Sequence, residues 1–254
     1  PYTTLFRSPE WQPDQCIQCN QCSYVCPHAV IRPFLLNEEE ARGLPDGTVL
    51  LDARGKGLEG LKFRIQISPL DCTGCGNCAD VCPAKEKALI MKPIDTQTEQ
   101  GYLWEYFTNR VSYKDNLIPK TTVKGSQFSQ PLFEYSGACA GCGETPYIKL
   151  ITQLFGERMM IANATGCSSI YGGTAPSTPY TTNPQGHGPA WASSLFEDAA
   201  EYGYGMLAGI NHMKERIADL AQSILEKDVS PDLKSALSEW MESHHDAVKS
   251  REIR

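Results

Sequence analysis

The chain has 254 residues, of which 41% are apolar, so it is long enough for about two domains that each bury a core. Its net charge of −7 argues against a nucleic-acid partner, and none of its apolar runs is long enough to span a membrane. Eleven cysteines occur without any segment that resembles a signal peptide. This combination indicates metal-binding thiols in a reducing compartment, so we expect a cytoplasmic protein rather than a disulfide scaffold.

A cysteine run occurs twice in residues 9–95. Each copy has the pattern C-x2-C-x2-C-x3-C-P, and the two copies are offset by 56 residues. This is the bacterial pattern for 4Fe-4S clusters, in which one tight loop supplies thiolates to three irons while its amide groups point at the sulfides. The runs consist of Cys16, Cys19, Cys22 and Cys26, and of Cys72, Cys75, Cys78 and Cys82.

The fourth ligand of each cluster is expected to come from the other run, as in two-cluster folds. We therefore assign one cluster to Cys16, Cys19, Cys22 and Cys82, and a second to Cys72, Cys75, Cys78 and Cys26. Zinc is disfavoured because a third cysteine two residues after a C-x2-C pair has no role in a tetrahedral site. Disulfides are disfavoured because nothing indicates secretion.

The rest of this ferredoxin-like region is expected to be strands and turns. Short apolar segments follow the two runs at residues 29–31 and 88–91 and are predicted to be strands. The insertion at residues 34–68 is predicted to hold two more, at 48–51 and 61–67. Residues 1–8 carry no pattern that predicts an element.

Residues 96–135 are polar and mixed, and they are predicted to be a crossing linker that lies on a neighbouring domain. Residues 136–254 are expected to begin an α/β domain. A glycine-rich loop leads to a helix that Thr145 caps and that ends at Gly156, and a short strand at 159–164 follows. The turn after this strand contains Thr165, Gly166 and Cys167, where ligands gather in such sheets.

The last part of the chain is predicted to be a helical hairpin. After the irregular loop at residues 172–190, the chain is expected to become helical from Trp191, and a second helix is expected to start at Ser230. Apolar residues recur at intervals of three and four in the first helix, and this stripe is predicted to be core. The stripe consists of Leu207, Ile210, Met213, Ile217, Leu220 and Ile224.

Three cysteines remain outside the two runs, namely Cys139, Cys142 and Cys167. A C-x2-C loop and a distant cysteine at the end of a strand can ligate a third 4Fe-4S cluster, but a zinc knuckle or free thiols also fit this spacing. A third cluster needs a fourth ligand, which is a residue beyond Arg254, a histidine or a water. For this reason, and because the chain does not begin with Met, we expect a piece of a longer polypeptide.

The chain resembles the middle of the single-chain pyruvate:ferredoxin oxidoreductases, over roughly residues 9–250. The segments around Cys139 and Cys167 are the most specific part of this resemblance. The matching segments are residues 14–28, 71–82, 133–147, 164–173 and 188–206. The resemblance implies an α+β ferredoxin-like two-cluster domain followed by part of an α/β thiamine-diphosphate-binding domain with a helical hairpin.

The resemblance also implies the cofactors and the reaction. Cys139, Cys142 and Cys167 would ligate a third, proximal cluster whose fourth cysteine lies far downstream, and Glu144, Cys167 and the Thr165-Gly166 turn would border thiamine diphosphate and its magnesium. The resemblance further implies an enzyme of anaerobic metabolism that oxidises pyruvate with coenzyme A and reduces ferredoxin or flavodoxin. It would act as a homodimer and involve neither nucleic acid nor membrane.

The chain also departs from the family. The motif that binds diphosphate and magnesium is absent, as is the N-terminal domain with the activating glutamate, so the chain alone is predicted to be inactive. Two alternative functions stay open. The first is a stand-alone ferredoxin-like electron-transfer module, which the Cys139 segment argues against. The second is a related 2-oxoacid:ferredoxin oxidoreductase, because the residues that would recognise the acid are not in this chain. A structural zinc protein would be a third class.

Overall fold

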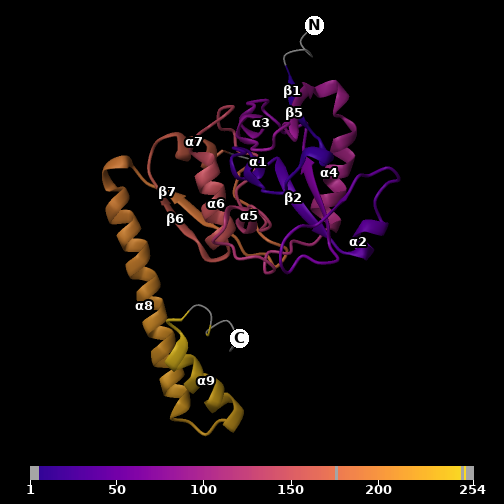
Figure 1. Cartoon of the computed structure of the whole chain (residues 1–254). Coiled ribbons are helices and arrows are strands. Elements are labelled where there is room, and N and C mark those ends of the chain that lie inside the picture. Colours follow the sequence, from indigo (N-terminus) through magenta and orange to yellow (C-terminus); the bar gives the residue numbers. More distant parts are fainter. Residues whose placement is uncertain (1–5, 175–176, 247–248, 250–254) are drawn as a thin grey trace. The chain divides into compact units, whose positions relative to one another are not determined.

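The computed structural model describes residues 6–174, 177–246 and 249, and the chain divides into two compact units, residues 1–193 and 194–254. Figure 1 shows the mixed helices and strands of the first unit and the two helices of the second. The first unit joins the predicted ferredoxin-like region to the segments that follow it. The unit boundary therefore lies near residue 193 and not at residues 96–135.

The first unit contains the duplication that the cysteine runs predict. The first copy consists of β1 (Arg7–Trp11), the 3₁₀ turn η1 (Pro13–Gln15), α1 (Gln21–Tyr24) and β2 (Ile31–Leu36). The second copy consists of β4 (Lys62–Ile67), α3 (Asn77–Val81) and β5 (Leu89–Pro93). The strands at 29–31 and 88–91 thus begin close to where they are expected.

The two copies pair through their outer strands. β1 pairs antiparallel with β5, with Pro9 opposite Met91, and β2 pairs antiparallel with β4, with Pro33 opposite Ile65. Each two-stranded ladder therefore joins the first strand of one copy to the last strand of the other. Side chains from both ladders, including Trp11, Ile31, Phe63 and Leu89, form one core with the buried cysteines.

The insertion between the copies adds α2 (Glu38–Arg42) and β3 (Leu51–Asp52), which extends the sheet to the order β2-β4-β3. The strand expected at 48–51 is therefore shorter and lies later in the sequence. A capping box starts α2, because the Asn37 side chain accepts from Glu40 N and the Glu40 carboxylate accepts from Asn37 N. The same carboxylate binds Lys114 at 2.6 Å, which fastens α2 to a segment more than 70 residues further along the chain.

Residues 96–135 are an integral part of the first unit. They include the end of η2 (Ile94–Thr96), the helix α4 (Glu99–Arg110) and the short α5 (Val123–Ser126). Phe107 of α4 is fully buried against Phe34 of β2, with ring centroids 5.1 Å apart. Sequence periodicity misses α4 because its apolar residues are few and mixed with polar ones. The segment does lie on its neighbour, but as packed structure.

The chain continues with α6 (Thr145–Phe155), η3 (Gly156–Arg158), β6 (Met160–Asn163), α7 (Cys167–Gly172) and β7 (Ala190–Ser193). β6 and β7 pair in parallel. The predicted helix and strand are present, with Gly156 at the expected C-cap, although the helix already includes Thr145 and Glu144 is its N-cap. Trp191 lies in β7, so the prediction that the chain turns helical there is wrong.

The second unit is a helical hairpin of α8 (Ala199–Leu225) and α9 (Pro231–Ser243), preceded by η4 (Phe196–Asp198). Ser230 caps α9, as predicted. Four of the six residues in the predicted core stripe of α8 are instead exposed and Ile210 and Ile224 are half-buried, because this unit offers one short partner helix to a helix of 27 residues. The exposed fraction of Met213 is 61% and that of Leu220 is 54%. No helix in the described ranges has the length and hydropathy needed to cross a membrane.

The burial of α4 predicts that Phe107→Ala lowers the free energy of unfolding by about 3–5 kcal/mol, the usual cost of an aromatic cavity in a core. Urea-induced unfolding, followed by a spectroscopic signal of the first unit, measures this loss of free energy. Tyr102→Ala on the same helix is the control, because this side chain is 80% exposed and its loss costs little. Equal, small effects of both substitutions would contradict an integral α4.

Candidate metal centres

The two cysteine runs adopt the same backbone conformation. The residue before the second cysteine has a positive φ in both copies, 59° at Gln18 and 69° at Gly74. The residue after it does too, 62° at Asn20 and 85° at Gly76. Glycine reaches this left-handed region without a Cβ penalty, and other residues enter it only when their surroundings hold them there.

Hydrogen bonds hold the two non-glycine residues of the first run. Gln18 donates from Nε2 to Asp52 O at 2.8 Å and accepts from Arg54 N at 2.8 Å. Asn20 donates from Nδ2 to Lys124 O at 3.0 Å. The insertion between the copies and α5 therefore support the loop that carries the first three cysteines.

The second run uses glycine for a different reason at each position. A Cβ added to Gly74 would lie 2.9 Å from the carbonyl oxygen of Arg7, so the loop approaches β1 too closely for a side chain. At Gly76 nothing lies within 4 Å, and only the positive φ favours glycine.

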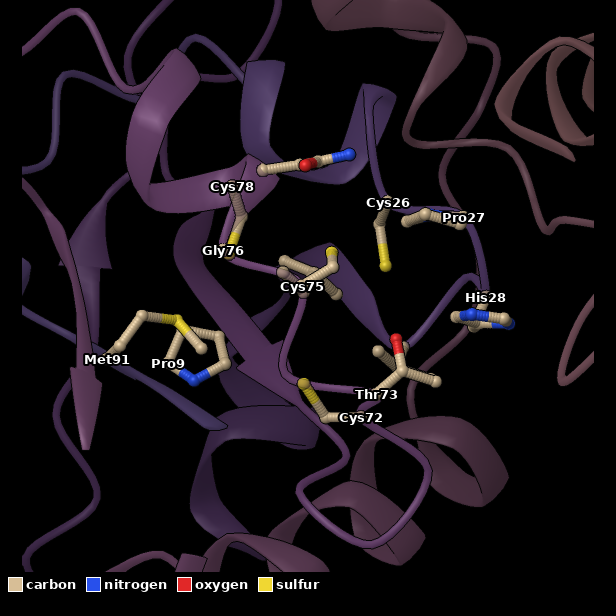
Figure 2. Close-up of a pocket in the computed structure, with 13 residues that line it drawn as sticks. Pro9, Cys26, Pro27, His28, Cys72, Thr73, Cys75, Gly76, Cys78 and Met91 are labelled. Atoms are coloured by element: carbon tan, nitrogen blue, oxygen red, sulfur yellow. The ribbon is translucent and has the colours of Figure 1, made fainter. Parts of the chain in front are cut away.

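One cavity collects the second set of cysteines that the sequence predicts. Its volume is about 310 Å³, part of it open to solvent, and Figure 2 shows the cysteine side chains entering it from two loops. Pro9, Val30, Ile31 and Met91 give it an apolar wall. The cysteines are three from the second run and the last of the first, namely Cys72, Cys75, Cys78 and Cys26.

The other predicted set is also brought together. Burial raises the pKa of the Cys16 thiol, and the nearby Cys19 and Cys82 thiols add to this effect. Burial likewise raises the pKa of Cys22, and the nearby Cys78 thiol of the other set, followed by Cys16 and Cys19, adds to this effect. The indole N–H of Trp11 lies near Cys16 and partly offsets the rise in the pKa of this thiol. Among the described residues, the same buried nitrogen has no hydrogen-bond partner at ordinary geometry.

The donor set fits 4Fe-4S clusters better than single metal ions. Within residues 6–174 and 177–246, no three His, Cys, Asp or Glu side chains converge on one point, as a zinc ion with bonds of about 2.3 Å requires. Backbone amides donate to sulfur at 3.4 Å, from Gly74 to Cys72 and from Ala88 to Cys82, and such bonds are typical of iron–sulfur sites.

The third set of cysteines is more open. Cys139 and Cys167 are exposed and Cys142 is half-buried. The loop of Cys139 and Cys142 nevertheless lies directly against the second run. A Cβ at Gly141, where φ is +73°, would be 3.5 Å from the Cys75 Cβ. The three thiols do not form a single-ion site among the described residues.

Polar contacts fasten the segment before Cys139 to the first run. The buried His28 donates from Nδ1 to Ser136 O at 3.0 Å, and Tyr135 N donates to His28 O at the same distance. The guanidinium of Arg32 pairs with Glu134. Burial lowers the pKa of His28, so its ring favours the neutral form. From its position after the cluster proline, His28 is expected at most to tune or shield the cluster, and no sequence pattern singles out Arg32. The only available signal was the position of His28, two residues after Cys26.

The residues expected near thiamine diphosphate lie at two helix starts. Glu144 is the N-cap of α6, and Gly166 is the N-cap of α7, whose first residue is Cys167. Burial and then the Glu144 carboxylate raise the pKa of Tyr180 to about 12, and the pKa of Tyr171 on α7 rises for the same reasons. Glu144 is therefore close to α7. Thr165, Gly166 and Cys167 are all exposed.

Two runs of buried and half-buried thiols on a duplicated strand–loop–helix–strand unit define an iron–sulfur protein of the two-cluster class. Comparison with known families agrees, because residues 15–85 match the family described as "4Fe-4S dicluster domain".

Comparison with known proteins extends the similarity to almost the whole chain. Over 96% of its length the chain is 60% identical to the pyruvate:ferredoxin oxidoreductase of Moorella thermoacetica and 54% identical to the pyruvate-flavodoxin oxidoreductase of Klebsiella pneumoniae. It is 49% identical over 95% of its length to a mitochondrial pyruvate dehydrogenase (NADP+) of Euglena gracilis. The chain corresponds to a segment of pyruvate:ferredoxin and pyruvate-flavodoxin oxidoreductases, and it spans 21% of the length of the first two relatives.

The crossed assignment, in which the last cysteine of each run serves the other cluster, predicts which thiols lose their cluster when Cys26 is replaced. In the chain loaded with iron and sulfide, Cys26→Ala is expected to reduce the iron content from about eight to about four per chain, since four-iron clusters need four ligands. Alkylation and mass spectrometry should then find the partner thiols reactive and the other set protected. The reactive thiols are expected to be Cys72, Cys75 and Cys78.

Cys139→Ala is the control for this experiment and should leave both sets protected. Release of Cys16, Cys19 and Cys22 by Cys26→Ala would show that each run keeps its own fourth cysteine, and the crossed assignment would be wrong.

Proposed function

We propose that this chain is the electron-transfer segment of an enzyme that decarboxylates pyruvate with coenzyme A, releases acetyl-CoA and CO2, and passes two electrons to ferredoxin or flavodoxin. The observation that carries the proposal is the cavity that Cys26 shares with three cysteines of the second run, in a chain that matches such enzymes over 96% of its length. The remainder of the same polypeptide would supply the sites for pyruvate and coenzyme A, and the enzyme would act as a homodimer.

The proposal assigns residues of this chain to three iron–sulfur clusters and to thiamine diphosphate. Two 4Fe-4S clusters are held by the crossed sets, and a third is held by Cys139, Cys142 and Cys167 together with a ligand from the rest of the polypeptide. A 4Fe-4S cluster accepts and releases single electrons at a potential that the surrounding protein sets. Thiamine diphosphate, with magnesium, stabilises the negative charge formed on loss of CO2, and Glu144, Thr165, Gly166 and Cys167 would border it.

Two features of the chain support a third site that works with the other two. Gly141 lies against Cys75, so the loop of the third set contacts the wall of the cavity that Cys26, Cys72, Cys75 and Cys78 line. On α6, which follows this loop, Tyr147 is 66% exposed and Phe155 is 65% exposed, as expected of a helix that packs against further chain. A stand-alone ferredoxin-like module would need neither feature.

The proposal has alternatives for two components, namely the final electron acceptor and the 2-oxoacid substrate. A relative named as an NADP+-linked pyruvate dehydrogenase contains the same segment, so the segment is compatible with more than one final acceptor. A related 2-oxoacid:ferredoxin oxidoreductase is the second candidate for the reaction, because residues that would recognise the acid are not identified in this chain.

Anaerobic reconstitution with iron and sulfide tests the cluster content. We expect about eight irons per chain and, after reduction with dithionite, the low-temperature EPR signal of two interacting 4Fe-4S clusters. About twelve irons would mean that the third set also assembles with a substitute ligand. Tight binding of zinc without iron would overturn the proposal.

The chain alone is predicted to have no pyruvate oxidation activity, because it lacks the family's motif for diphosphate and magnesium. The assay is reduction of a viologen dye with pyruvate, coenzyme A, thiamine diphosphate and magnesium, and the intact relative from Moorella thermoacetica is the positive control. The dithionite-reduced chain should still pass electrons to an added ferredoxin. Turnover by the reconstituted chain would show that a complete active site lies within these 254 residues.

A further inference from the structure

A buried lysine reaches the first cysteine run from α6. Lys149 is only 1% exposed, and its ammonium group donates to three backbone carbonyls at the end of α1. The acceptors are Ser23 O, Tyr24 O at 3.3 Å and Cys26 O at 3.4 Å. An ammonium group has three protons to donate, so these carbonyls account for all its hydrogen bonds.

These hydrogen bonds do not supply a counter-charge. In the part of the chain that the structure describes, the lysines paired with a carboxylate are Lys62, Lys114 and Lys120, and Lys149 is not among them. A buried cation without an opposite charge costs several kcal/mol. Burial accordingly lowers the pKa of Lys149 to about 8. The thiols of Cys26 and Cys22 act in the opposite direction, and the Arg32 guanidinium lowers this pKa further.

The position of the lysine identifies the missing negative charge. Cys22 and Cys26 belong to different crossed sets, so the stretch that Lys149 contacts contributes one ligand to each expected cluster. A cluster held by four thiolates is negative, and each electron that it accepts adds another negative charge. A fixed positive charge in a buried, weakly screened place stabilises that reduced state.

We propose that Lys149 is the charge that sets the reduction potential of the two-cluster centre from outside the cysteine runs, acting most strongly on the cluster that Cys26 ligates. The lysine raises the potential of this cluster and so favours its reduced form. Because α6 begins directly after Glu144, the helix that starts at the candidate cofactor loop also delivers this charge. The inference rests on the proposed function only in requiring the two clusters.

The test uses the full chain loaded with iron and sulfide and separates the effect of the lysine's charge from the effects of its packing and hydrogen bonds. Lys149→Met removes the charge and the donors, and Lys149→Gln removes the charge but keeps a donor. In EPR-monitored redox titrations both should lower the midpoint potential of one cluster, by a shift that favours the oxidised form at least tenfold, or about 59 mV for one electron.

Gln153→Met on the same helix is the matched control. This side chain is also buried and donates to Ser129 O at 2.9 Å, but it is neutral, so its loss should leave the potentials unchanged. Wild-type potentials in both Lys149 variants at full iron content would overturn the proposal. So would a wild-type potential in Lys149→Gln alone, because hydrogen bonding would then explain the effect.

A second measurement covers variants that fail to assemble clusters. If such a variant unfolds in its iron-free form at the same urea concentration as the iron-free wild type, its charge is needed by the clusters and the proposal stands. If it unfolds at a lower concentration, the lysine has a structural role and the proposal falls. Failure of the wild-type chain to bind iron would instead contradict the proposed function.

Discussion

The exchange of one cysteine between two loops is the constraint on which the first unit depends. Cys26 leaves its own run to line the cavity of the second, and Cys82 lies near Cys16 of the first. In the proposed crossed assignment, neither run completes a four-thiol site without the other. The crossed strand pairs, β1 with β5 and β2 with β4, meet the same requirement, because each ladder also takes one strand from each copy.

The residues that support the two loops differ, although both loops have positive φ angles on either side of the second cysteine. The second run reaches its positive φ values with glycine, whereas the first uses Gln18 and Asn20 and holds them with hydrogen bonds from distant segments. The first loop is therefore tied to the insertion and to α5. This dependence gives the region after the second run a structural role at the metal centres, which its mixed polar composition did not suggest.

The cysteine spacing was sufficient to predict the duplication and the strands around it, since metal ligation imposes a pattern that is local in sequence. The structure places Cys26 in one cavity with three thiols of the second run and Cys82 near Cys16, and the crossed ligation stays a prediction. What the sequence could not reveal depends on distant partners. Phe107 is buried only because Phe34 packs on it, and Lys149 is buried only because three carbonyls of another segment accept from it.

α6 shows why periodicity can mislead about which face of a helix is inside. Its buried residues are polar, namely Thr145, Lys149, Thr152 and Gln153, while Tyr147 and Phe155 are exposed. An apolar stripe is normally evidence for a buried face. Here the polar face makes specific hydrogen bonds to two distant segments. Lys149 donates to three carbonyls beside the first cysteine run, Gln153 donates to Ser129 O, and Thr152 Oγ1 accepts from Leu132 N. Hydrogen-bond partners far away in the sequence therefore determine the inner face of this helix, and hydrophobic periodicity does not detect them.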